Sequence, residues 1–246
     1  MLVASNIDVI VLCAGLGKRL RPLTNDVPKA LVPVAGRPLL AYHLEAIRKA
    51  GLRRVVCVVG YKAEKVKDFA GDGSRFDLDV RYCCQDPPNG TGGAVLCAEH
   101  HVRSTTFAVI YADIFFHPMD TVWRDLILDN RPKIVCSQVE DASQFGRVET
   151  SPSPEGLVLQ RIIEKDGRAT PGLVNAGLFL LPRGIFSILR SQKRSPRGEI
   201  ELPQAVEQLS RFETKVHVNL VNGWVDIGSL PQLRVASHLA GDKSIE

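Results

Sequence analysis

The amino-acid sequence predicts an α/β fold in which a mainly parallel sheet is flanked by helices, giving three α/β/α layers. Short apolar runs alternate with segments whose apolar residues recur at helical spacing, which is the pattern of strand–helix–strand units. The first apolar run leads directly into glycines, as at the carboxyl end of a buried parallel strand. With 246 residues, of which 45% are hydrophobic and 24% charged, the chain is long enough for one large α/β core.

The first half of the chain shows the alternation most clearly. Residues 7–13 (IDVIVLC) read as a buried strand, and residues 38–49 carry apolar side chains at helical spacing. Pro38 suits the first turn of that helix, and Gly51 suits its C-terminal cap. The other elements expected here are strands at 55–59, 80–84 and 107–111 and helices at 63–69 and 93–102.

The second half changes character, because its strands are joined by turns rich in serine and proline. No internal repeat or linker separates two independent units, so we predict one domain spanning residues 1–246. Its halves would be about 1–115 and about 116–240, and the last two strands would close the sheet. The expected strands are 146–150, 157–164, 173–181, 215–220 and 223–227, and the helices are 185–191, 202–209 and one from Leu230.

Composition excludes several classes of protein. A formal charge of +4 and 6% aromatic residues, without a basic stripe, argue against nucleic-acid binding, and the basic stretch 190–197 reads as a solvated loop. None of the six cysteines forms a CxxC pair, which favours reduced thiols and a cytoplasmic location. Asp8 interrupts the N-terminal apolar run, and no run of eighteen apolar residues occurs, so we expect neither export nor a membrane partner.

The segment after the first strand, Ala14-Gly15-Leu16-Gly17-Lys18-Arg19-Leu20, is a candidate phosphate-binding loop. With its continuation to Lys29 we call it the glycine loop. Its glycines let backbone N–H groups approach a phosphate chain closely. The dinucleotide fingerprint needs a third glycine where Leu20 stands, and the P-loop needs four residues between its glycines, so dehydrogenases and P-loop ATPases are disfavoured. Arg19 and Lys29 add two cations that can follow a triphosphate along the loop.

The continuation GLGKRLRPLTNDVPKALVPVAGRPLL closely resembles the signature of the sugar-phosphate nucleotidyltransferases, GxGxRLxPxTxxxPKxLxPVxGxP. The resemblance implies a Rossmann-like fold and an enzyme of the EC 2.7.7 type. Such an enzyme joins a sugar 1-phosphate to a nucleoside monophosphate taken from an NTP and releases pyrophosphate. It also implies catalytic roles for Arg19 and Lys29 and nucleotide binding by Ala14, Gly15 and Gly17.

A second segment, QDPPNGTGGA at 85–94, resembles the base-binding segment of the same family. Asn89 stands where the family usually has an apolar residue. The resemblance implies nucleotide binding by Gln85, Gly90 and Thr91. We expect Gly92 and Gly93 to open a helix, and we favour a functional role for them over a packing role.

Two carboxylates occupy family motifs and suggest a metal. Asp113 follows the strand 107–111, at the edge where ligands bind in open α/β sheets. The family has glycine before this aspartate, so Ala112 is a departure. Asp226 lies in Gly-Trp-Val-Asp-Ile-Gly and matches the second carboxylate of the family. Two carboxylates with phosphate oxygens and waters form a typical Mg²⁺ shell, so we predict Mg²⁺ as the cofactor.

The later motifs correspond to the acceptor pocket of the family. The resemblance implies sugar-phosphate binding by Gly146, Glu164, Lys165 and Asn175. The segment GEIEL at 198–202 also resembles a family segment, and we assign it to folding or packing. Since the resemblance covers about residues 7–240, we expect a stand-alone transferase without the β-helix that some relatives carry. Its partners would be an NTP and a sugar 1-phosphate, with homo-oligomerisation left open.

Two other functions compete with this one. Phosphocholine-type cytidylyltransferases share much of the loop signature, but the glycine-rich segment 90–94 favours a sugar substrate. A non-catalytic regulatory subunit that binds nucleotide sugars would not require Arg19, Lys29, Asp113 and Asp226 together. The base and the sugar stay open, with guanylyl- and uridylyltransferases the best matches.

The resemblance assigns nucleotide binding to the half at about 1–115 and sugar-phosphate binding to the half at about 116–240, and this division into donor and acceptor halves gives a testable prediction. Lys165→Ala should raise the KM for the sugar 1-phosphate about ten- to hundred-fold and leave that for the NTP nearly unchanged, because one charge-assisted contact contributes roughly 1.5–3 kcal/mol. Steady-state kinetics with each substrate varied in turn measures both constants. Glu164→Gln should instead alter the preference among sugar stereoisomers. Lost NTP affinity with unchanged acceptor affinity would contradict the division.

Overall fold

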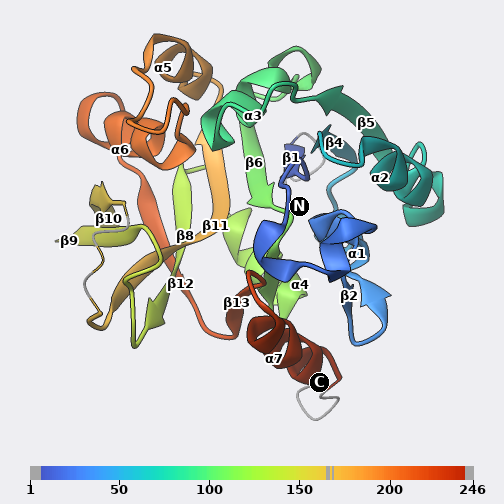
Figure 1. Cartoon of the computed structure of the whole chain (residues 1–246). Helices are drawn as coiled ribbons and strands as arrows, with labels where there is room; N and C mark the ends of the chain where they lie inside the picture. Colours follow the sequence, from blue (N-terminus) through green and yellow to red (C-terminus); the bar gives the residue numbers. More distant parts are fainter. Residues whose placement is uncertain (1–6, 165–166, 168, 242–246) are drawn as a thin grey trace.

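The computed structural model describes residues 7–164, 167 and 169–241. A nine-stranded sheet runs through this part of the chain (Figure 1). Its strands are β1 Asp8–Leu12, β4 Arg54–Val59, β5 Asp79–Cys84, β6 Thr106–Tyr111, β8 Lys133–Val139, β9 Arg147–Ser153, β10 Gly156–Ile163, β11 Gly172–Pro182 and β12 His217–Val221. Their order across the sheet is β5-β4-β1-β6-β11-β8-β12-β10-β9.

The sheet is mixed rather than uniformly parallel. β1 pairs in parallel with both β4 and β6, and β4 pairs in parallel with β5. From β11 onward most pairings are antiparallel, with β12–β8 as a parallel exception. The predicted α/β class with a central sheet flanked by helices is confirmed, and parallel pairing is concentrated in the first half of the chain.

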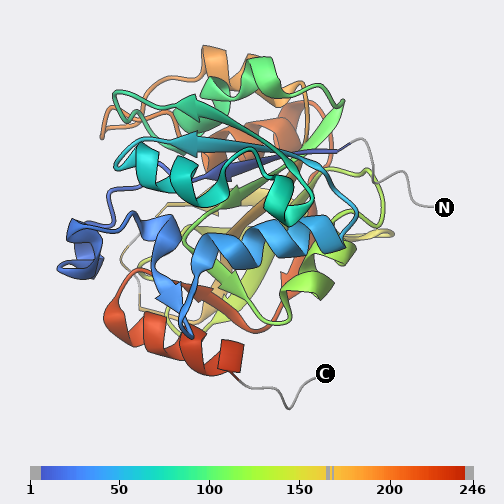
Figure 2. The ribbon, with the colours of Figure 1, turned by 90° about the vertical axis from the view of Figure 1, so that its right-hand side faces the viewer.

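Helices cover both faces of the sheet because its central strands are apolar on both sides. In β1, Val9 and Val11 pack into the core with α1, α2, α4 and α7, whereas Ile10 packs on the opposite face with α3, α5 and α6. Figure 2 shows the two helical layers on either side of the strands. The helices are α1 Leu39–Lys49, α2 Ala63–Ala70, α3 Thr91–Cys97, α4 Met119–Leu126, α5 Ile185–Ser191, α6 Leu202–Phe212 and α7 Leu230–Gly241. Among the described residues, no helix has the length and apolar character needed to cross a membrane.

Several short elements were not expected from the sequence. They are α4, β8 and the strand β7 (Ile114–Phe116). β7 pairs with β13 (Trp224–Asp226) in a separate two-stranded sheet, so the expectation that residues 223–227 close the main sheet was wrong. A second small pair joins β2 (Pro33–Val34) to β3 (Arg37–Pro38). The two pairs lie in the connections at the carboxyl ends of β6 and β1, and such short strands carry little sequence pattern.

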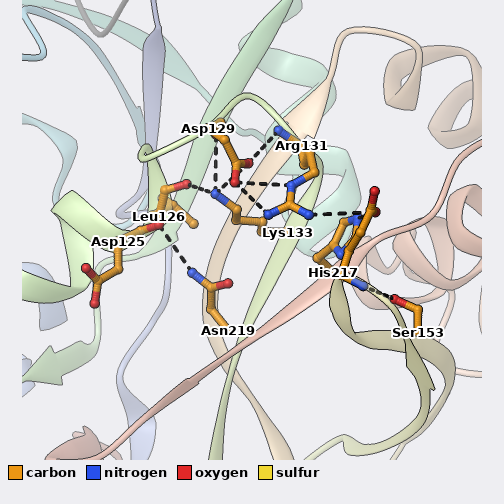
Figure 3. Close-up of polar contacts among 9 residues, drawn as sticks. Asp125, Leu126, Asp129, Arg131, Lys133, Ser153, His217 and Asn219 are labelled. Atoms are coloured by element: carbon orange, nitrogen blue, oxygen red, sulfur yellow. Dashed lines mark hydrogen bonds and ion pairs between the residues drawn. The ribbon is translucent and has the colours of Figure 1, made fainter. Parts of the chain in front are cut away.

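A buried ammonium group anchors the amino end of β8 (Figure 3). Lys133 is only 3% exposed, and its Nζ donates to the backbone oxygens of Leu126 and Asp129 at 2.8 and 3.3 Å. The Asp129 carboxylate lies 2.9 Å from the same nitrogen and also accepts from Arg131. Because Arg131 and Lys133 both donate to it, the pKa of Asp129 lies far below its ordinary value, although partial burial opposes this. The cluster ties the loop after α4 to the sheet, away from the site described below.

His43 on α1 makes the stability of the fold pH-dependent. The side chain is fully buried, and burial lowers the pKa of His43 to about 4, with the charge of Asp113 acting in the opposite direction. The native state therefore keeps the imidazole of His43 neutral at pH values where the unfolded chain protonates it. The contribution of His43 to the free energy of unfolding is complete above pH 6.5 and is lost as the pH falls toward 4. When the pH is lowered from 7.5 to 5.0, the free energy of unfolding measured by urea denaturation should fall by about 2 kcal/mol more for the wild type than for His43→Leu. Equal losses in both proteins would contradict this assignment.

Candidate active site

Three neighbouring cavities open at the carboxyl ends of β1 and β6. The first has a volume of about 330 Å³, the second about 260 Å³ and the third about 190 Å³. Asp113, directly after β6, lines all three. The sequence-predicted residues fall into groups according to the cavities that they line. Ala14, Gln85 and Gly90 line the first cavity, Gly146, Glu164, Asn175 and Asp226 the second, and Gly17 the third. Four residues line two cavities each: Thr91 the first and second, Gly15 and Lys29 the first and third, and Arg19 the second and third. Lys165 lies outside the described residues.

The loop after β1 is held in a left-handed turn at Gly17. Its φ is +61°, and a Cβ placed there would lie 2.9 Å from Cγ2 of Thr24. The buried Thr24 hydroxyl donates to the Gly17 carbonyl oxygen at 2.8 Å, which fastens the loop from behind. The glycine is therefore required both by its backbone conformation and by the close approach of Thr24.

The carboxylates of Asp113 and Asp226 come together because their strands pair. In the register of β7 and β13, Asp226 lies opposite Ile114, and the N–H of Ile227 donates to the Asp113 carbonyl oxygen at 2.9 Å. Lys29 joins them from the glycine loop: its Nζ lies 2.5 Å from Asp113 Oδ2 and 3.9 Å from Asp226 Oδ1. Two carboxylates from distant parts of the chain thus face one cation, with side chains that are only 32% and 20% exposed.

Gln85 presents one defined end of its amide to the first cavity. Its Nε2 donates to the carbonyl oxygen of Gly90 at 2.8 Å and to Oδ1 of Asn89 at 2.7 Å. Since a carbonyl oxygen can only accept, this end of the amide must be the NH₂ group. The Gln85 carbonyl oxygen is left as an acceptor for a ligand. Asn89, the departure from the family pattern, supplies the second of these anchors.

Two backbone hydrogen bonds and one to a side-chain hydroxyl fasten the segment 89–92 to the segment 199–202. The N–H of Ile200 donates to the Asn89 carbonyl oxygen at 2.8 Å, and the N–H of Gly92 donates to the Ile200 carbonyl oxygen at 2.8 Å. The N–H of Leu202 donates to the Thr91 hydroxyl at 3.0 Å. We call these contacts the clasp. It joins the first half of the chain to the second beside the first and second cavities.

Gly92 and Gly93 are packing glycines inside α3 rather than cavity residues. A Cβ on Gly92 would lie 2.7 Å from side-chain atoms of Ile200 and Leu189, and one on Gly93 would lie 1.8 Å from Asn89 Oδ1. Neither glycine lines any of the three cavities. The functional role that the sequence favoured for this pair finds no support in their positions.

The second cavity offers carboxylate, amide and backbone groups. A Cβ on Gly146 would lie 3.2 Å from Glu164 Oε1, so the glycine lets this carboxylate approach the backbone. Asn175 Oδ1 accepts from the N–H of Gly177 at 2.9 Å, which leaves the NH₂ group of Asn175 as a donor. Groups of this kind bind hydroxyl-rich ligands.

Sequence reasoning missed several cavity residues. Glu199 lines the first and second cavities, so the assignment of 198–202 to folding or packing was incomplete. The alternation in GEIEL was the available signal, because Ile200 packs against the core while Glu199 and Glu201 line the second cavity. Tyr111 also lines both cavities, and burial raises the pKa of its hydroxyl well above the ordinary value, which keeps it a neutral donor. Further residues of the second cavity are Arg197 and Trp224.

Fold and site together define an α/β protein with a glycine-rich, cationic loop facing two carboxylates across adjoining cavities. A family model described as nucleotidyl transferase matches residues 8–242. The chain belongs to this nucleotidyl transferase family.

Individual relatives agree with that membership. The bifunctional protein GlmU of Methanococcus maripaludis is 34% identical over 222 residues, which cover 90% of this chain and 51% of the relative. A glucose-1-phosphate thymidylyltransferase of Streptomyces griseus is 33% identical over 94% of this chain and 65% of its own length. The Haloferax volcanii low-salt glycan biosynthesis nucleotidyltransferase Agl11 is 30% identical over 96% of this chain and 67% of its own length. The chain thus spans about half the length of the GlmU proteins that it matches.

Solved structures share the fold. A Bacillus anthracis protein described as a glucose-1-phosphate thymidylyltransferase, in complex with sucrose, matches with a TM-score of 0.82 and 24% identity over 98% of this chain and 97% of its own. A UDP-glucose pyrophosphorylase complexed with UDP-glucose matches with a TM-score of 0.81 and 21% identity over 98% of both chains. The arrangement of strands and helices described above is therefore that of known nucleotidyltransferase structures.

The clasp gives a prediction at Gly90, where φ is +99° and a Cβ would lie 2.4 Å from the Ile200 carbonyl oxygen. Gly90→Ala should push the segments 89–92 and 199–202 apart, raise the KM for the NTP at least about tenfold and lower the melting midpoint, since the backbone strain alone costs about 1–3 kcal/mol. Gly184→Ala is the matched control, because a Cβ there would have only one neighbour within 4 Å, at 3.5 Å. Kinetics and thermal melting measure both effects, and wild-type values for Gly90→Ala would refute the role of the clasp.

Proposed function

We propose that the chain is a sugar-1-phosphate nucleotidyltransferase that converts an NTP and a sugar 1-phosphate to an NDP-sugar and pyrophosphate. The observation that carries the proposal is the position of Asp113 and Asp226. The pair lies against Lys29 of the glycine loop, and Asp113 lines the first and second cavities together with the third. The relatives named as thymidylyltransferase and nucleotidyltransferase support the same reaction class.

The donor set at these carboxylates fits a divalent cation. Both aspartates already face one positive charge, the Lys29 ammonium group. Carboxylates together with phosphate oxygens and waters are the ligands that Mg²⁺ prefers. Among the described residues, no cluster of three or more histidine, cysteine, aspartate or glutamate side chains could hold a metal, so the phosphates of the substrates would complete the shell. When bound, Mg²⁺ neutralises charge on the reacting phosphates.

The reaction is an in-line displacement at the α-phosphorus of the NTP. A phosphate oxygen of the sugar 1-phosphate forms the new P–O bond, the bond to the β-phosphate breaks, and pyrophosphate leaves with that electron pair. A phosphate monoester is largely dianionic at neutral pH, because its second pKa is about 6, so no general base is required. Catalysis is then positioning and charge stabilisation.

The residues divide between donor and acceptor. We assign the triphosphate to Ala14, Gly15, Gly17 and Arg19, and the α-phosphate to Lys29, whose cation lies at the junction of the cavities. We assign the base to the first cavity, with the Gln85 carbonyl oxygen and the backbone near Gly90 and Thr91 as its polar partners. The acceptor residues are Gly146, Glu164 and Asn175 in the second cavity, together with Lys165 on the basis of the sequence.

We also propose for the enzyme the cellular compartment and the binding partners that the sequence predicts. All six cysteines are free thiols, which supports a reducing cytoplasmic compartment. An NTP and a sugar 1-phosphate would be its partners, and a homo-oligomer is left open.

One experiment tests the reaction class and the substrates together. Four NTPs are combined with a panel of sugar 1-phosphates and with phosphocholine, with and without Mg²⁺, and pyrophosphate release is measured. We expect Mg²⁺-dependent release with at least one sugar 1-phosphate. In Asp113→Ala and Asp226→Ala the rate should fall by orders of magnitude while circular dichroism and the melting midpoint show a folded protein. Release only with phosphocholine would favour the cytidylyltransferase alternative, and nucleotide-sugar binding without turnover would favour the regulatory one.

A further inference from the structure

The guanidinium group of Arg19 rests against the backbone of Gly228. A Cβ placed on Gly228 would lie 2.9 Å from Nη2 and 3.1 Å from Cζ of Arg19. Real Cβ atoms essentially never come within 3.0 Å of another heavy atom, so any side chain at position 228 would displace the guanidinium group. Gly228 and Arg19 also line the third cavity together with Gly15, Gly17 and Lys29.

The backbone of Gly228 does not itself require glycine. Its φ lies outside the left-handed region that glycine alone adopts easily. Its N–H donates to the Asp226 carbonyl oxygen at 2.8 Å and to Gln232 Oε1 at 3.0 Å, and the same Gln232 oxygen accepts from the Ser229 hydroxyl at 3.0 Å. Gly228 is thus fixed from both sides, by the end of β13 and by the first turn of α7. The atoms that oppose a side chain are those of Arg19 and, at 3.2 Å, Gln232 Oε1.

Among the described residues, the Arg19 guanidinium group has no hydrogen-bond or ion-pair partner. Its donors are therefore available to a ligand, and a planar guanidinium is well suited to phosphate oxygens. A displaced guanidinium would remain in the second and third cavities, where Asp113 and Asp226 offer carboxylates. An ion pair there would withdraw Arg19 from a phosphate and would also occupy the proposed metal ligands.

We propose that Gly228 is a positioning residue for the NTP: its missing side chain leaves the space in which Arg19 rests with its donors directed to the phosphates. The proposal depends on the proposed function, because it takes the third cavity to hold the triphosphate. It assigns a role to the glycine two residues after Asp226, between β13 and α7.

The test compares Gly228→Ala with Gly241→Ala, a control at the end of α7 where a Cβ would meet nothing within 4 Å. The ligand is whichever of the four NTPs the wild type binds most tightly. Its Kd is measured by calorimetry with Mg²⁺ and without acceptor, and both KM values are measured kinetically. Gly228→Ala should raise the Kd and KM for the NTP about ten- to hundred-fold, because charge-assisted contacts are lost, and leave the KM for the sugar 1-phosphate within about twofold. Gly241→Ala should match the wild type.

A double-mutant cycle shows whether Gly228 acts through Arg19. Arg19→Ala should weaken NTP binding, and adding Gly228→Ala should weaken it no further. The clashing atoms are the far end of a flexible side chain, so Gly228→Ala should keep a melting midpoint close to that of the wild type, and a loss of NTP affinity then reports the displaced guanidinium rather than unfolding. Additive losses of NTP affinity, or wild-type NTP affinity in Gly228→Ala, would overturn the proposal. A wild type that binds the NTP but releases no pyrophosphate with any acceptor would instead overturn the proposed function.

Discussion

The antiparallel pairing of β7 with β13 is the contact on which the site depends. The pairing sets Asp226 beside Ile114, and the hydrogen bond from Ile227 to the Asp113 carbonyl oxygen holds the two carboxylates at a fixed separation. Two neighbouring negative charges repel each other, and Lys29 offsets this repulsion from a third part of the chain. The glycine loop, the end of β6 and the C-terminal motif therefore stabilise one another, and none of them forms the site alone.

Much of the fold could be predicted because its central strands are continuous apolar runs bounded by glycine or polar residues. β1, β4 and β6 are of this kind, and their parallel pairing follows from the helices between them. β8 was missed because Lys133, Ser137 and Gln138 interrupt its apolar pattern, and the burial of Lys133 depends on Asp129 and two backbone oxygens that the sequence does not place. β7 and β13 have three residues each, too few for any periodicity to identify their partners.

The site was predictable to the extent that its residues sit in linear motifs. The glycine loop, Gln85, Gly90 and the two aspartates all reach the cavities. The loop, Gln85 and Asp113 follow the ends of β1, β5 and β6 at one edge of the main sheet, and the pairing of β13 with β7 brings Asp226 to the same place. Glu199 and Tyr111 were missed for a different reason. Tyr111 reads as the last residue of a strand, and Glu199 reaches the first cavity only through the clasp, which is a contact between segments more than a hundred residues apart.

The first and second cavities adjoin, since Thr91, Tyr111, Asp113 and Glu199 line both. A molecule that combines a nucleotide with a sugar phosphate can therefore occupy both cavities at once. Such a molecule loses its overall translational and rotational freedom once, whereas two separate molecules lose it twice. For the proposed reaction, the shared lining would favour retention of the joined product over either substrate alone, and bisubstrate compounds with a short linker would be the inhibitors that suit this geometry.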